Sequence, residues 1–74
     1  MTYEAQEVVR LLRTWPGVFV SYGEIARRAN RKRFQEDPNW ARQALRGLVD
    51  QGILEQDSAG GFRLAEDAEK KLAA

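Results

Sequence analysis

The stretch LRGLVDQGILE, from Leu45 to Glu55, carries two structural signals one after the other. Its first half places Leu45, Leu48 and Val49 at the three- and four-residue spacing of a helix with one apolar face. Gly52 then supplies a residue that readily adopts the left-handed backbone of a helix end, and the apolar pair after it favours a strand. The stretch therefore predicts a helix that stops at Gly52 and passes straight into a strand.

Upstream of this stretch, Asp37 and Pro38 mark where the same helix is expected to begin. Asp37 is a favourable N-cap, and Pro38 loses nothing at the first helical position because that position needs no amide hydrogen. On a helical projection, one face is apolar and contains Trp40, Ala41, Ala44, Leu45, Leu48 and Val49. The opposite arc, about 100° wide at 3.6 residues per turn, carries Asn39, Arg42, Gln43 and Arg46.

An earlier helix is predicted within VSYGEIARRA, from Val20 to Ala29. Ser21 and Glu24 stand at the spacing of a capping box, in which each side chain bonds the other residue's amide. The buried stripe of this helix is expected to be Ile25, Ala26 and Ala29, with Tyr22 at its edge. Residues Asn30 to Asp37 then form a long turn, from which Phe34 is expected to anchor into the core.

The N-terminal part predicts a first helix that Pro16-Gly17 brings to an end, with Thr2 as its cap. Its apolar residues recur at helical spacing and are Ala5, Val8, Val9, Leu11, Leu12 and Trp15. Val18 to Val20 is a run of strand-favouring residues and is expected to form one short edge strand.

Past Gly52 the pattern becomes extended. Ile53 to Gln56 and Phe62 to Leu64 flank Asp57 to Gly61, which predicts a β-hairpin with a flexible tip. Ala65 to Leu72 is predicted as the last helix. Two pairs of opposite charge at i,i+4 spacing would support it, namely Glu66 with Lys70 and Asp67 with Lys71.

Length and composition predict a single compact soluble domain over residues 1–74, near the lower size limit for a hydrophobic core. The chain has no cysteine and no histidine, which removes disulfides, thiol nucleophiles, imidazole bases and the usual zinc ligands. No apolar run approaches the ~20 residues that span a bilayer. We therefore expect a cytoplasmic protein with no metal, no cofactor and no membrane partner.

The net charge of +1 conceals an uneven distribution. From Arg10 to Arg46, nine basic residues stand against three acidic ones, whereas residues 1–9 and 47–74 are both net acidic. A basic middle between acidic ends favours a polyanionic partner. The alternative is a solvated surface with no partner, which a run of charges often is.

The basic residues gather on the helix at residues 21–29 and in the turn after it. There the predicted phosphate-binding residues are Tyr22, Arg27, Arg28, Arg31, Lys32 and Arg33. Arg28 also has a structural alternative, because Glu24 lies four residues before it. On the next helix, arginine, asparagine and glutamine are the side chains that make bidentate contacts with guanine and adenine. The polar arc Asn39, Arg42, Gln43 and Arg46 is thus predicted either to contact DNA or to face solvent.

The predicted order of helix, strand, helix, helix, hairpin and helix resembles a winged helix-turn-helix domain, a mostly helical α+β fold. SYGEIARRA is similar to its second helix, ARQALRGLVDQGILE to its third helix and exit, and DSAGGFRL to its wing. The resemblance implies that the chain binds double-stranded DNA, as a small transcriptional regulator or an accessory factor. It adds Gly60, Gly61 and Arg63 as candidate wing residues.

Two points stay open within this resemblance. The turn Asn30–Asp37 is longer than the turn usual in such domains, which puts the docking angle of the third helix in question. The second interpretation is a winged helix that binds a protein instead of DNA. Its contact surface would be the acidic C-terminal region together with the wing.

VSYGEIARRA also resembles the segment before the active site of alkylguanine-DNA alkyltransferases. In that comparison, Tyr22 matches a tyrosine that helps turn a nucleotide out, and Arg42 matches an arginine that fills the gap. Those enzymes need a Pro-Cys-His-Arg motif, and this chain has neither cysteine nor histidine. The carboxylates are scattered and no Gly-rich phosphate loop is present, so we expect no enzymatic activity.

Overall fold

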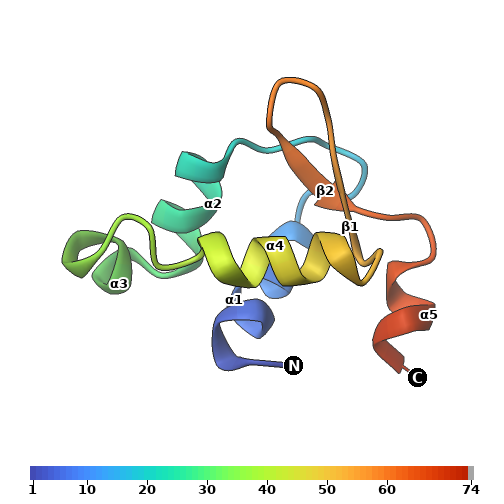
Figure 1. Ribbon diagram of the computed structural model, residues 1–74, viewed down its shortest axis with the longest axis horizontal. Coiled ribbons are helices and arrows are strands. Elements are labelled where there is room, and N and C mark those ends of the chain that lie inside the picture. Colours follow the sequence, from blue (N-terminus) through green and yellow to red (C-terminus); the bar gives the residue numbers. More distant parts are fainter. Residues whose placement is uncertain (74) are drawn as a thin grey trace.

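The computed structural model describes residues 1–73, which fold around one cluster of buried side chains (Figure 1). The helices are α1 (Tyr3–Leu12), α2 (Tyr22–Ala29), α3 (Arg31–Glu36), α4 (Arg42–Asp50) and α5 (Ala68–Ala73). The strands β1 (Leu54–Gln56) and β2 (Phe62–Leu64) pair as an antiparallel hairpin after the first four helices. This is a small, mostly helical α+β domain. None of the helices in residues 1–73 has the length and apolar character needed to cross a membrane.

The predicted junction at Gly52 is confirmed. Gly52 adopts a φ of 74°, and its amide donates to the Val49 carbonyl over 2.9 Å. The amide of Ile53 donates to the Leu48 carbonyl over 3.0 Å. These two bonds define a Schellman motif, which satisfies carbonyls that the end of α4 would otherwise leave unpaired. The motif turns the chain sharply enough for β1 to begin at Leu54.

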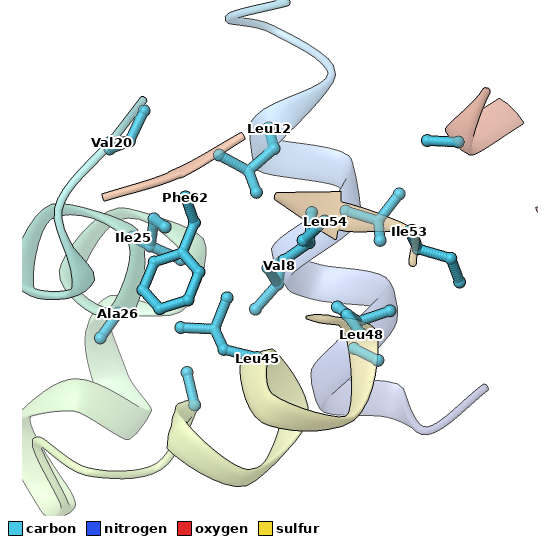
Figure 2. Packing of buried hydrophobic residues seen from close by; sticks show 14 of the residues in the cluster. Val8, Leu12, Val20, Ile25, Ala26, Leu45, Leu48, Ile53, Leu54 and Phe62 are labelled. Carbon is cyan, nitrogen blue, oxygen red and sulfur yellow. The ribbon is translucent and has the colours of Figure 1, made fainter. Parts of the chain in front are cut away.

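The apolar stripes meet in the core as predicted. Figure 2 shows side chains from α1, α2, α4 and the hairpin gathered at one centre. The predicted residues that are buried are Ala5, Val8, Val9, Leu12, Ile25, Ala26, Trp40, Ala41, Leu45 and Leu48. The predicted residues that are partly buried against them are Leu11, Trp15, Tyr22, Ala29, Phe34, Ala44 and Val49. The expectation that Phe34 anchors to the core is confirmed.

The strand predicted at Val18 to Val20 was wrong. Only Val20 pairs with the hairpin, through two bonds of 2.8 Å between its backbone and that of Phe62. Val18 instead donates its amide to the Trp15 carbonyl, closing a turn in which Gly17 has a φ of 79°. The Val18 amide is thus used in this turn, and Val18 forms no bridge to a strand within residues 1–73. The element order therefore differs from the predicted one.

The region predicted as a long turn contains the helix α3. Asn30 begins it, because the Oδ1 atom of Asn30 accepts a bond of 3.0 Å from the Arg33 amide. Phe34 then packs against the core and holds the helix on the domain. A helix of six residues spans fewer than two turns, which is too short for a periodic apolar pattern to reveal it.

The start predicted for the helix at Asp37 and Pro38 was also wrong, since α4 begins at Arg42. The carboxylate of Asp37 accepts from the Asn39 amide over 3.0 Å, which closes a local turn. Trp40 is held in this turn by a bond of 2.9 Å from its indole nitrogen to the Ala26 carbonyl. Residues 38–41 are consequently turns, and Asn39 precedes the helix.

The last helix begins later than predicted, at Ala68. Ala65 continues the hairpin instead, because its amide donates to the Ile53 carbonyl over 2.9 Å. The predicted pair Asp67–Lys71 is present at 3.4 Å, whereas no ion pair joins Glu66 to Lys70. A second ion pair, with two bonds of 2.8 Å from Arg13 to Glu69, fastens α5 to the end of α1.

Gly47 and Gly52 offer a matched test of the junction. Gly52→Ala should destabilise the fold by about 1–2 kcal/mol, the cost of a left-handed backbone for a residue with a Cβ. Gly47 lies inside α4, and a Cβ added there would meet nothing within 4 Å. Gly47→Ala should therefore stabilise the fold by about 0.5–1 kcal/mol. Urea unfolding measures both changes, and a shift of both variants in the same direction would contradict the described end of α4.

Candidate nucleic-acid interface

A hollow of about 350 Å3 lies between α4, the first residue of α2 and the hairpin. Arg42, Arg46 and Asp50 line it from successive turns of α4. Tyr22 lines it from α2, and Gln56 and Phe62 line it from the hairpin. The hollow thus combines two arginines and one carboxylate with aromatic and amide side chains, from three elements.

Arg42 is held in place on two sides. Its Nε atom donates to Oδ1 of Asn39 over 2.8 Å. The central carbon of its guanidinium lies 4.1 Å from the centre of the Tyr22 ring, within the range of a cation–π contact. Arg42 is nevertheless exposed to solvent. Its guanidinium is therefore ordered yet accessible.

Tyr22 is itself fixed, because its hydroxyl is bonded twice. It donates to the Pro38 carbonyl over 2.7 Å and accepts from the Ala41 amide over 3.2 Å. These bonds join the start of α2 to the turn before α4. Tyr22 thus acts as a support for Arg42 and for α4, a role that its place on the edge of an apolar stripe did not reveal.

The polar arc predicted on this helix is divided in the structure. Arg46 shares the hollow with Arg42 and forms no ion pair within residues 1–73. Asn39 lies before α4 and bonds Arg42. Gln43 lies on the other edge of α4, where it lines separate hollows together with Thr2 and Glu4. Of the four predicted residues, only Arg42 and Arg46 line the same hollow.

The two arginines of α2, Arg27 and Arg28, both form ion pairs with Glu24. Ser21 caps α2 as predicted, by accepting from the Glu24 amide. The Glu24 side chain does not complete the capping box, because its carboxylate pairs with Arg28 at 2.8 Å and also with Arg27. The hydrogen bond from Arg28 and the charge of Arg27 lower the pKa of Glu24. The structural alternative for Arg28 is therefore the arrangement observed.

Arg31 and Lys32 of α3 stay exposed, and neither forms an ion pair within the described part of the chain. Arg31 lines a second hollow, of about 440 Å3, beside Trp15 and the α2 arginines. Arg28 lies over the Trp15 ring at 5.4 Å. This second group shares no lining residue with the hollow at Arg42 and Arg46.

Arg33 forms an ion pair with a residue that lies far from it in sequence. It pairs with Glu4 of α1 at 2.8 Å, and its guanidinium lies 5.3 Å from the centre of the Trp40 ring. A backbone hydrogen bond and the bond from Arg33 lower the pKa of Glu4. Arg33 thereby ties α3 to α1.

The three hairpin candidates all have partners within the fold. Gly60 adopts a φ of 88°, and the Gly61 amide donates to Oδ1 of Asp57 over 2.6 Å. Arg63 bonds Glu55 across the hairpin at 2.8 Å and lies over the Phe19 ring at 4.3 Å. Both glycines therefore shape the turn, and the charge of Arg63 is balanced by Glu55.

Sequence reasoning did not name Asp50, Gln56 and Phe62 as site residues, although all three line the hollow. It predicted the helix that carries Asp50 and the strands that carry Gln56 and Phe62, which pair with each other. What the pattern lacked was the side of α4 against which the hairpin packs. No protein-family model, curated protein or solved structure matches this chain.

Glu24 is expected to weaken the attraction of this region for polyanions. Glu24→Gln removes the charge that pairs with Arg27 and Arg28, so the protein should elute from immobilised heparin at higher salt than wild type. Glu66→Gln is the matched control, since Glu66 is exposed and forms no ion pair within residues 1–73. Equal elution of the two variants would show that only the net charge matters and that the pairing with Glu24 does not.

Proposed function

We propose that the protein binds double-stranded DNA as a winged helix-turn-helix domain, in which α4 enters the major groove and the hairpin serves as the wing. The observation that carries this proposal is the pair Arg42 and Arg46, which line the hollow at the wing without forming an ion pair in residues 1–73. Five other arginines, at positions 13, 27, 28, 33 and 63, are paired with acidic side chains.

Part of the element order supports the proposal. After α1, Val20 bridges to β2, and α2, α3, α4 and the hairpin follow, so that α3 is an element absent from the predicted order. A helix is about 10–12 Å across with its side chains, and the major groove is about 12 Å wide. The N-cap of α4 is Ala41, which gives the first turn no side-chain hydrogen bond within residues 1–73. Amide hydrogens and the helix dipole favour an anion at such a helix start.

The additional helix α3 does not cover the face of α4 that carries Arg42 and Arg46. In Figure 1, α3 lies beyond the N-terminal end of α4, away from the hairpin. Phe34 and the pair Arg33–Glu4 bind it to the rest of the domain. Arg31 and Lys32 are exposed on α3, where they would contact phosphates that flank the groove.

Protein binding is the second candidate function, and one observation favours it. Val18 and Phe19 are adjacent and exposed, with 53% and 37% of their surfaces accessible. Phe19 lies beside Arg63 of the hairpin. An apolar pair at this position would suit a protein surface. Failure of the wild-type protein to bind duplex DNA would support this second function.

Two double variants with equal charge test the proposal. Arg42→Ala with Arg46→Ala should weaken binding to a random-sequence duplex by about tenfold or more, because two groove contacts are lost. Arg10→Ala with Lys70→Ala removes the same charge from α1 and α5 and should change affinity far less. Fluorescence anisotropy at several salt concentrations measures both affinities. For wild type, the slope of log K against log[salt] should be about −3, as expected for three to four phosphate contacts. Equal losses in the two variants, or no binding of wild type at low salt, would refute the proposed surface.

A further inference from the structure

The guanidinium of Arg42 has contacts on two sides that leave its two terminal nitrogens open. Its Nε–H group is used by Asn39, whereas no group in residues 1–73 accepts a hydrogen bond from its two terminal nitrogens. The Tyr22 ring covers one face of its plane. The two terminal nitrogens of Arg42 are therefore the donors that remain for a ligand.

The support of Arg42 extends into the core. Asn39 is itself held by Asp37, whose carboxylate accepts from the Asn39 amide. Tyr22 is partly buried, and its hydroxyl is bonded to Pro38 and Ala41. An arginine whose plane is fixed before binding loses less conformational freedom on binding. A fixed plane favours a bidentate contact, in which both terminal nitrogens meet their acceptors together.

We infer that Arg42 reads a single guanine in the major groove, through bonds from its two terminal nitrogens to O6 and N7 of that base. This inference rests on the proposed function. Guanine presents two acceptors side by side on its major-groove edge, which match the arginine fork. Residues at the N-terminus of a recognition helix are the ones that contact base edges, and Arg42 is the first residue of α4.

The same geometry assigns different roles to the neighbouring residues. Asn39 and Tyr22 are positioning residues, because they act on DNA through Arg42. Arg46 has no hydrogen bond or stacking partner within residues 1–73 comparable to those of Arg42. It therefore supplies charge, and its loss should weaken binding to all sequences alike.

The inference is tested by selecting bound duplexes from a pool with a randomised core of about ten base pairs, one turn of DNA, and sequencing them. Wild type should favour guanine at one position by about 5- to 150-fold, the discrimination given by a bidentate contact. Arg42→Ala removes every donor at this position and should abolish the preference. Arg46→Ala removes the same charge and should preserve it. Asn39→Ala should weaken the preference, and Asn39→Asp, which keeps an acceptor oxygen, should restore it.

Two results overturn the inference in distinguishable ways. If wild type binds the pool but Arg42→Ala keeps the same base preference, guanine recognition by Arg42 is wrong while DNA binding stands. If folded wild type retains no duplex from the pool at low salt, the proposed function fails and the inference fails with it. Circular dichroism of each variant confirms that it is folded before selection.

Discussion

The bonds that join α2 to the segment before α4 are the constraint on which the rest of the structure depends. The indole nitrogen of Trp40 donates to the Ala26 carbonyl in a buried contact, and the Tyr22 hydroxyl bonds Pro38 and Ala41. Loss of a buried bond leaves an unsatisfied group and costs about 1–3 kcal/mol. Because α3 separates α2 from α4 in sequence, these bonds join α2 to the segment before α4 across α3. They also support the Tyr22 ring beneath Arg42.

Ion pairing decides which cations of this nearly neutral protein are available to a partner. Glu24, Glu4 and Glu69 are bonded to arginines, and their pKa values are lowered. A carboxyl group with a lowered pKa in the folded state contributes stability above its ordinary pKa, and this contribution is lost on acidification. At neutral pH these pairs stay charged. The cations of the region predicted to bind that form no ion pair within residues 1–73 are therefore Arg31, Lys32, Arg42 and Arg46.

The sequence predicts those parts of the fold that local chemistry decides. Gly52 ends α4, Thr2 and Ser21 cap α1 and α2, and the hairpin pairs with the expected strands. It does not predict elements that depend on competition between hydrogen bonds. Asp37 was expected to begin a helix, but its carboxylate closes a turn instead. Val18 to Val20 was expected to form a strand, but the Val18 amide closes the turn at Gly17 and only Val20 pairs with β2.

In the candidate site, too, the sequence predicts the features that depend on local spacing and misses those that depend on distant contacts. Helical spacing places Arg42 and Arg46 on one side of α4, and the structure agrees. Whether a cation is paired depends on contacts between distant parts of the chain. Arg33 meets Glu4, 29 residues away, and Arg13 meets Glu69, 56 residues away. No local pattern contains that information. The basic residues predicted to bind therefore lie in separate groups, one at Arg42 and Arg46 and another at Arg27, Arg28 and Arg31.

The central claim is that DNA binds to the exposed face of α4 beside the hairpin. The most direct test is titration of isotope-labelled protein with a random-sequence duplex, followed by amide chemical shifts in NMR. The account predicts the largest shift changes at Tyr22, from Arg42 to Arg46, and at Gln56, with little change in α5. Largest changes around Trp15 and Arg31, or in α5, would contradict it.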